Sequence, residues 1–283
     1  MQEKTYKNIE TINISTISGL AELFKFFEFE EDKKRTRSSY LFRGISSTVH
    51  PLITSLERFC GKKKEVLEKP MLRNFTKYAI GENRLIGDSV WHQLIIGQHH
   101  GLPTRMMDWT YSPLMALHFA LSESDPARIG SQDCEIWAVS TKEMITLLPL
   151  KYQFKLKEEN AFCFTIDMLK SLANDLSEYD KDMKNVISNE RKESHSAMVF
   201  MEPPSIDQRI VNQYSYFSIV PSHIDRVDNY FDETTTETKR IIIDKSIHWE
   251  TRDMLDTLNI NERIVYPGLD GIAMWLKRHY FVK

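Results

Sequence analysis

The segment from residue 97 to residue 110, GQHHGLPTRMMDWT, gathers side chains that bind anions and transfer protons. His99 and His100 stand at the end of a predicted helix, where the helix dipole favours protonated imidazole. A Gly-Leu-Pro turn ends this helix, and Thr104 and Arg105 follow it. An anion beside the N-terminus of the next helix would meet free backbone N–H groups together with the Arg105 guanidinium. We therefore predict that this segment lines a binding site for an anionic ligand.

Two other interpretations of the segment stay open. Arg105 and Asp108 are three positions apart and could pair with each other, with Trp109 anchoring a polar corner. His92 and His99 are seven positions apart, so a continuous helix would place both imidazoles on one face, where Asp108 could complete a metal site. Because no second ligand motif accompanies these residues, we expect no metal.

Arg43 is a second candidate, within the apolar run LFRG at residues 41–44. An arginine in a strand points to the face opposite its neighbours, and its planar guanidinium can grip a phosphate or a carboxylate through two parallel hydrogen bonds. Gly44 directly after it would allow a ligand or another backbone to come close. The alternative is a water-exposed arginine at the edge of a sheet.

Two further candidates are less specific. Gln213 precedes the strand-prone run YSYFSIV, and period-2 alternation places its side chain on one face with Ser215 and Phe217. A glutamine there could orient a ribose hydroxyl or a water molecule, or it could be an ordinary polar residue at a strand edge. The lysine run at 62–64 could follow a phosphate backbone, although such runs more often start a solvated helix.

Composition restricts the class of protein. The chain has 283 residues, a net charge of −3 and 41% hydrophobic residues, so it can form a core but is not a polycation built for duplex DNA. Three cysteines without a CxxC pair argue against a disulfide framework or a cysteine-rich zinc site. The GxGxxG, GxxxxGK[ST], HExxH and GxSxG motifs are missing from the sequence, which argues against four large enzyme classes. No stretch approaches the roughly 18 apolar residues of a membrane span, and we expect a cytoplasmic protein.

Hydrophobic patterning predicts strands with irregular helices between them, and so a mixed α/β (α+β) fold. The expected strands lie at 39–43, 135–140, 196–202, 214–220 and 239–244. The expected helices lie at 17–29, 62–86, 91–100, 248–258 and 270–280. Another helix is expected to begin after Ser112 as N-cap, with Pro113 in its first turn. The residues after Pro51 are expected to be extended. We expect a helical lead-in at 1–38 and one domain at 39–283, with the charged stretch 167–194 as an exposed helical excursion.

Four blocks of the sequence together resemble the FRG domain family, named after a tripeptide that stands here at residues 42–44. LFRGIS with HPLITSLERF is similar to the family's opening block, and QHHGLPTRMMDWTYSPLMALHFAL is similar to its central block almost residue for residue. DQRIVNQYSYFSI resembles its third block and INERIVYPGLDGIAMWL its closing one, so the blocks span roughly residues 40–280. Two departures are Met106-Met107 in place of the usual Leu-Leu pair and Ser215 in place of the usual glycine.

A weaker resemblance, to arginine-type ADP-ribosyltransferases, implies a fold and a mechanism. In those enzymes an early strand carries an arginine that grips a phosphate of NAD, small polar residues lead into an A-x-x-F-A helix, and a later strand carries a catalytic Glu or Gln. Arg43, Thr104 with ALHFA (116–120) and Gln213 stand here in the corresponding order. The resemblance implies an ADP-ribosyltransferase-like split β-sandwich core decorated with helices. Glu202 is an alternative carboxylate on the preceding strand.

The same resemblance assigns roles to the candidate residues. The catalytic set would be Arg43, His99, Gln213 and Glu202. Arg43 and Gly44 would hold a phosphate of NAD, and His99 or His100 would bond to a ribose hydroxyl. Thr104 and Arg105 would shape the pocket for the nicotinamide and a phosphate. Trp109 or Tyr111 would stack on the nicotinamide.

The implied function is transfer of ADP-ribose from NAD to RNA, DNA or protein, in a toxin or antiviral defence effector held by an antitoxin or other inhibitor protein. Attack by water instead would make the protein an NADase. A non-catalytic module that binds nucleotide or nucleic-acid phosphate through Arg43, His99 and Arg105 is a rival, as is a nuclease using His99 and His100. A carboxylate held close to Arg43 across a cleft would favour catalysis. A cleft with phosphate donors but no acidic or amide residue would favour binding.

Overall fold

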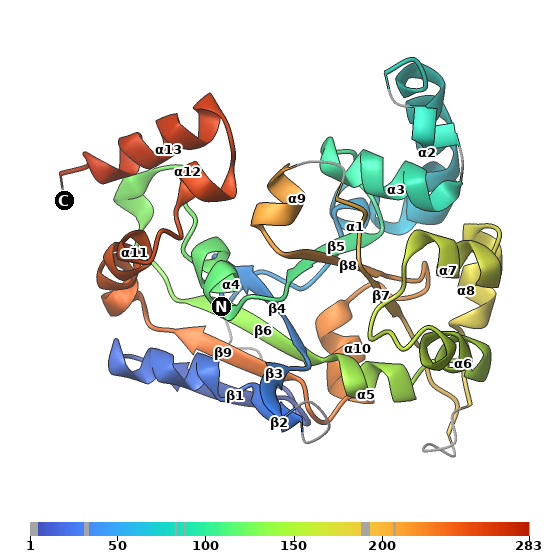
Figure 1. Cartoon of the computed structure of the whole chain (residues 1–283), viewed down its shortest axis with the longest axis horizontal. Coiled ribbons are helices and arrows are strands. Elements are labelled where there is room, and N and C mark those ends of the chain that lie inside the picture. The colour runs from blue at the N-terminus through green and yellow to red at the C-terminus, as the bar shows by residue number, and fades with distance from the viewer. Residues whose placement is uncertain are drawn as a thin grey trace.

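A seven-stranded sheet forms the centre of the part that the computed structural model describes, which comprises residues 5–30, 34–82, 84–87, 89–187, 193–205 and 208–282 (Figure 1). The strand order is β1-β9-β6-β4-β5-β8-β7, and every neighbouring pair is antiparallel except β1 with β9. The strands are β1 (Glu10–Ile14), β4 (Tyr40–Ile45), β5 (Met106–Thr110), β6 (Cys134–Ser140), β7 (Val199–Met201), β8 (Ser215–Ile219) and β9 (Lys239–Ile243). The predicted mixed α/β class is confirmed, and so are the five predicted strands.

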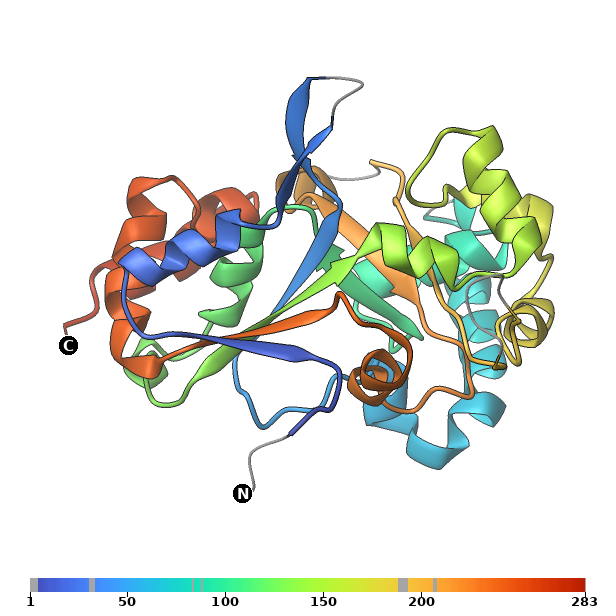
Figure 2. The same cartoon turned by 90° about the horizontal axis from the view of Figure 1, so that it is seen from below.

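Helices gather at the two ends of this sheet (Figure 2). One group comprises α4 (Pro113–Ala120), which packs against β4, together with α11 (His248–Thr257), α12 (Glu262–Val265) and α13 (Leu269–His279). At the β7 end lie α2 (Lys64–Ala79), α3 (Val90–His99), α6 (Leu150–Glu158), α7 (Ile166–Leu172) and α8 (Leu176–Asp182). The remaining helices are α1 (Ser55–Cys60), α5 (Thr141–Thr146), α9 (Gln208–Asn212) and α10 (Val227–Thr234). None of the helices in the described residues combines the length and apolar composition that a membrane crossing needs.

Strand β4 is fully paired with its neighbour on one side and pairs with its neighbour on the other side at one position only. All six residues of β4 pair with β6, from Tyr40 with Ser140 to Ile45 with Glu135. By contrast, β4 pairs with β5 through a single register position, Phe42 with Thr110. Because adjacent strands in a sheet are twisted relative to each other, a join of one pair lets the two strands diverge. The seven strands therefore form one sheet with a narrow join between its two halves.

Helix α4 packs against β4 at a contact that only glycine permits. Its start is the predicted one, because the Ser112 side chain accepts a hydrogen bond from the Met115 N–H at 3.3 Å and Pro113 occupies the first turn. A Cβ atom on Gly44 would lie 2.0 Å from the carbonyl oxygen of Ala116 and 2.5 Å from the backbone nitrogen of Ala120. Gly44 is thus needed for close approach of a helix.

The segment before β4 differs from the expected helical lead-in. Only Ser18–Phe24 is helical, as a 3₁₀ helix, and it is followed by β2 (Phe27–Glu30), which pairs with β3 (Arg35–Ser38). This hairpin projects from the body of the molecule (Figure 2), and β1 extends the main sheet. The alternation of phenylalanine and glutamate in FEFE has the period of a strand, which outweighs the helical spacing before it.

Two other segments also differ from expectation. The run after Pro51 is extended only up to Thr54, whose hydroxyl accepts from the Glu57 N–H at 3.0 Å and starts helix α1. Within 167–194 the side chains of Leu169, Tyr179 and Met183 are fully buried in the core, so the described part is not an exposed excursion. Helix α7 packs against α3 and α6, and α8 meets β8 where the Tyr179 hydroxyl donates to the Ile219 carbonyl oxygen at 2.6 Å. Residues 188–192 lie outside the described part.

Replacing Gly44 with alanine should lower the free energy of unfolding by at least about 2 kcal/mol, because the added methyl group forces α4 away from β4. Chemical denaturation monitored by circular dichroism measures this change. Gly81→Ala is the matched control, since a Cβ there meets nothing within 4 Å. Equal stability of the two variants would contradict the proposed packing constraint.

Candidate functional site

A cleft of about 830 Å³ lies where β4 and β5 diverge. Its lining comes from β4, the loop after it, α1, α3, β5, α4, α9 and the loops that follow α9 and α12. Segments far apart in the sequence therefore meet there. The volume falls in the range of about 300–1,000 Å³ that ligand sites occupy.

Arg43 on β4 reaches across the cleft to β5. Its Nη1 donates to the carbonyl oxygen of Asp108 and lies 3.7 Å from Oδ2 of the same residue. Burial lowers the pKa of Arg43, and the like charge of Arg58 on α1 lowers it further. The negative charge of Asp108 acts in the opposite direction and raises this pKa. The Nε of Arg43 is buried and has no acceptor among the described residues. Since an unpaired buried donor costs about 1–3 kcal/mol, the guanidinium is suited to an additional anionic acceptor.

Asp108 is held in place by a directed chain of hydrogen bonds. The Thr104 hydroxyl accepts from the Met106 N–H at 3.1 Å, so its own proton goes to Oε1 of Gln98, 2.5 Å away. This contact fixes the orientation of the Gln98 amide, and its Nε2 donates to Oδ2 of Asp108 at 3.0 Å. The carboxylate of Asp108 is 59% exposed and remains open to a ligand.

The cleft is positively charged although the chain is acidic overall. Arg43, Arg58 and Arg209 line it together with His50, whereas Asp108 is the carboxylate among the described lining residues. A concentration of guanidinium groups around one opposing carboxylate favours anionic ligands with more than one charge.

Gln213 lines the cleft from the opposite half of the sheet. Its carbonyl oxygen accepts from the Thr110 hydroxyl at 2.8 Å, and its side-chain Nε2 donates to the carbonyl oxygen of Val265 at 3.3 Å. Strand β8 begins two residues later, because Tyr214 adopts a left-handed conformation with φ +50°. The expected alternation therefore does not include Gln213, but Gln213 and Ser215 both face the cleft.

Arg105 lies outside the cleft, in a buried ion-pair cluster. Its Nε donates to Glu68 at 2.8 Å and its Nη1 to Asp180 at 2.7 Å. These hydrogen bonds and charges raise the pKa of Arg105 although burial opposes them. The cluster ties the start of β5 to α2 and α8, so Arg105 is not placed to contact a ligand in the cleft. The alternative pairing of Arg105 with Asp108 is not found either, since Arg105 pairs with Glu68 and Asp180.

Five of the other predicted site residues are also absent from the described lining of the cleft: His99, His100, Thr104, Tyr111 and Glu202. His99 and His100 end α3 as predicted, with their rings in edge contact at 5.1 Å. Tyr111 lines a separate cavity of about 90 Å³, and Glu202 is exposed after β7. The described residues contain no cluster of three or more His, Cys, Asp or Glu suited to a metal ion.

Thr104 and Trp109 support the cleft from behind. Thr104 is buried and acts through Gln98, as described above. Trp109 borders the cleft, but its indole N–H donates to the Ser218 hydroxyl at 2.9 Å and its ring packs in edge contact with Phe200 and Phe231. The buried ring of Trp109 is therefore not positioned to stack on a ligand.

Several lining residues were not predicted from the sequence to contact the ligand. Gln98 and Asp108 stand within the opening segment, but nothing in their spacing showed that they bond to each other. Arg58, Arg209 and Tyr266 stand inside the blocks HPLITSLERF, DQRIVNQYSYFSI and INERIVYPGLDGIAMWL. Arg58, Arg209 and Tyr266 could have been predicted as site residues because they are polar or aromatic residues within these blocks.

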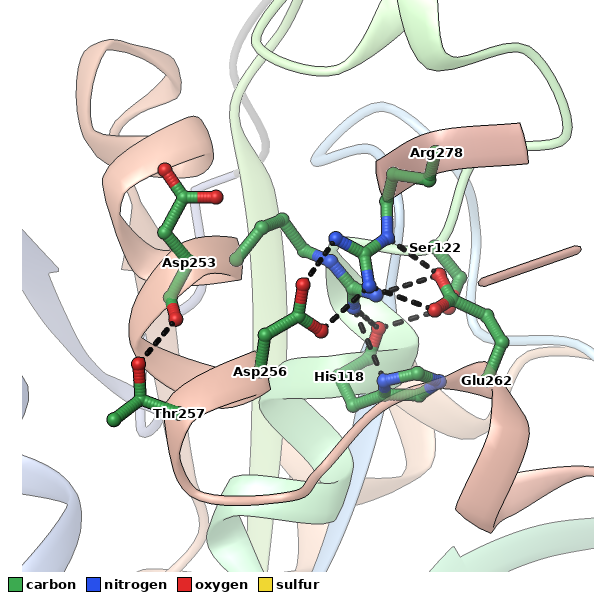
Figure 3. Close-up of polar contacts among 8 residues, drawn as sticks. His118, Ser122, Asp253, Asp256, Thr257, Glu262 and Arg278 are labelled. Carbon is green, nitrogen blue, oxygen red and sulfur yellow. Dashed lines mark hydrogen bonds and ion pairs between the residues drawn. The ribbon is translucent and has the colours of Figure 1, made fainter. Parts of the chain in front are cut away.

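A buried polar network fixes the C-terminal helices beside the cleft (Figure 3). Glu262 on α12 accepts from Arg252 at 2.6 Å and from Arg278 at 2.8 Å, and Arg278 also donates to Asp256. Burial alone would raise the pKa of Glu262, but the bonds from Arg278 and the charge of Arg252 lower it to about 2. His118 on α4 accepts from Arg252 at 3.0 Å through Nδ1, because arginine has no acceptor to offer. The network thereby links α4, α11, α12 and α13.

The fold and the cleft define a mixed α/β domain with an arginine-lined site at a narrow join in its sheet. The family model of the FRG domain matches residues 38–128, so this part of the chain is similar to the FRG domain family. The match includes Arg43, Arg58 and Asp108, but it ends before Gln213 and Tyr266. No curated protein and no solved structure matches the chain.

The buried network predicts an acid-sensitive fold. Burial and the charge of Arg252 lower the pKa of His118 from 6.5 to about 3. The unfolded chain therefore binds a proton at His118 below pH 6.5 that the folded chain does not accept until about pH 3. As the pH is lowered from 6.5 to about 3, the free energy of unfolding should fall by up to about 1.4 kcal/mol per pH unit because of this residue.

His118→Asn keeps an acceptor for Arg252 but cannot titrate, so its stability should fall less steeply from pH 6.5 to pH 4.5. Urea denaturation at a series of pH values measures the slopes. The exposed His100→Asn serves as the matched control and should keep the wild-type slope. Parallel curves for wild type and His118→Asn would show that His118 does not cause the acid sensitivity.

Proposed function

We propose that the chain is an ADP-ribosyltransferase that binds NAD in the cleft between β4 and β5 and transfers ADP-ribose to a macromolecule. The observation that carries the proposal is the pairing of Arg43 with the Asp108 carboxylate across the cleft, with the amides of Gln98 and Gln213 in the same lining. An arginine alone would suit a site that only binds phosphate. The carboxylate and amides beside it favour catalysis.

The arginines would hold the diphosphate of NAD. The Arg43 guanidinium presents a planar pair of donors, and its Nε has no acceptor among the described residues. Arg58 lies close enough to lower the pKa of Arg43, so the two cations can share one polyanion. Binding would relieve the repulsion between these like charges.

Asp108 would act where positive charge develops. When the bond between nicotinamide and ribose breaks, its electron pair leaves with the nicotinamide nitrogen and the ribose carbon becomes cationic. A preoriented carboxylate stabilises that cation, and Gln98 and Thr104 supply the orientation. The acceptor's nucleophilic atom then bonds to the ribose carbon and loses its proton to water. The carboxylate role thus passes from Glu202 to Asp108, and Gln213 is placed to position a ribose hydroxyl.

A module that binds nucleotide phosphates without reaction is the second candidate, favoured by the three arginines of the lining. A nuclease built on His99 and His100 has less support, since neither imidazole is in the described lining. As a transferase, the protein would act in the cytoplasm on RNA, DNA or protein, as a toxin or defence effector restrained by an inhibitor protein.

Arg43→Ala and Asp108→Asn should each reduce nicotinamide release and label transfer by about 100-fold or more, because each removes a charge that the transition state needs. The measurement is incubation with labelled NAD together with cell lysate, RNA or DNA. Glu202→Gln and the exposed Arg73→Ala are matched controls and should retain wild-type rates.

Absence of both label transfer and nicotinamide release from folded wild-type protein would refute the transferase. Nicotinamide release without label transfer would identify water as the acceptor and make the protein an NADase. A 100-fold loss in Glu202→Gln alone would return the catalytic role to that carboxylate.

A further inference from the structure

Tyr266 and Arg209 form a pair in the lining of the cleft. The guanidinium carbon of Arg209 on α9 lies 5.2 Å from the centre of the Tyr266 ring, which follows α12. Both residues line the same cleft as Arg43 and Asp108, and the charge of Asp108 acts on the Tyr266 phenol. They lie outside residues 38–128, which the FRG family model matches.

The backbone that carries Tyr266 is firmly held. A Cβ on Gly271 would lie 1.8 Å from the Tyr266 carbonyl oxygen, so α13 packs directly on this backbone. Asn212 Nδ2 donates to the carbonyl oxygen of Ile264 at 2.7 Å, which joins α9 to α12. Glu262 at the start of α12 is anchored by two arginines in the buried network (Figure 3). The ring position therefore does not depend on a flexible loop.

The chemistry of the pair suits a flat, uncharged heterocycle. Burial raises the pKa of Tyr266, so its phenol is neutral at physiological pH. An aromatic ring and a guanidinium plane are the two surfaces on which nucleobases stack in proteins. The phosphate-binding groups Arg43 and Arg58 lie in the same cleft. One cleft therefore presents phosphate donors and a stacking surface together.

We propose that Tyr266 and Arg209 form a base-stacking platform, and that the cleft takes ligands in which a planar heterocycle is joined through ribose to a phosphate or diphosphate. This inference rests on the proposed function for the placement of the phosphates at Arg43, but it requires no turnover. The heterocycle on the platform is adenine, since it is planar and uncharged, whereas the nicotinamide ring of NAD carries a positive charge that the Arg209 guanidinium beside Tyr266 would repel.

Binding of base-containing and base-free probes tests the platform. Isothermal titration calorimetry with ADP and with pyrophosphate should show tighter binding of ADP to the wild-type chain. Tyr266→Leu should weaken ADP binding by about 10-fold and leave pyrophosphate binding unchanged, because only the stacking surface is lost. Tyr266→Phe should retain ADP binding, and Tyr280→Leu is the matched control at an exposed tyrosine after α13.

Three results would overturn the platform. They are equal affinity of the wild type for ADP and pyrophosphate, equal weakening of both probes in Tyr266→Leu, and a loss in Tyr266→Phe as large as in Tyr266→Leu. Circular dichroism of each variant confirms that it is folded. If Tyr266→Leu fails to fold, Arg209→Lys gives a second test, because it keeps the positive charge and removes the guanidinium plane beside the ring. It should weaken ADP binding and leave pyrophosphate binding unchanged, and unchanged binding of both probes would overturn the platform.

Titration with AMP and with nicotinamide mononucleotide tests the choice of base. In Tyr266→Leu the affinity for AMP should fall and that for nicotinamide mononucleotide should not; a fall for nicotinamide mononucleotide alone, or for neither, would overturn the adenine platform. The outcome is separable from that of the transferase. ADP binding that depends on Tyr266, without nicotinamide release from NAD, would uphold the platform and refute the transferase.

Discussion

The single register pair between β4 and β5 is the constraint on which the rest of the structure depends. Phe42 and Thr110 hold the two halves of the sheet together at one point, and the strands diverge from there. A fully paired ladder would have closed this space with backbone hydrogen bonds. Divergence instead leaves a cleft in which Arg43 from one strand and Asp108 from the other face each other. The site is therefore a product of incomplete strand pairing.

Two groups of arginines among the described residues differ in their partners. Arg105, Arg240, Arg252 and Arg278 are buried and each contacts at least one carboxylate at 2.8 Å or less. Such pairs need several hydrogen bonds to offset the cost of desolvation, and removing one partner is destabilising. They fix α2, α4, α8, α11, α12 and α13 around the sheet. The arginines of the cleft face one carboxylate among the described lining residues, which leaves positive charge for a ligand.

Local sequence rules predicted the elements well where one signal dominated. Ser112 with Pro113 marked the start of α4, and the apolar run 135–140 marked the fully buried strand β6. Prediction was less successful where two periodicities compete, as in residues 17–29, or where burial decides the outcome, as in 167–194. Leu169, Tyr179 and Met183 are too few to distinguish a packed helix from an exposed one without knowledge of the surface they meet.

The sequence by itself determined the mixed α/β class and the resemblance to the FRG domain family, whose model matches residues 38–128, and it singled out Arg43 and Gln213, which line the cleft. It could not separate Arg43 from Arg105, since both are arginines at the edge of a strand-forming apolar run. Only the tertiary structure decided this, because Arg105 meets Glu68 and Asp180, 37 and 75 positions away, whereas Arg43 meets the open side of a diverging strand pair. The partner of a charged side chain is set by contacts far apart in sequence, and no local pattern encodes them.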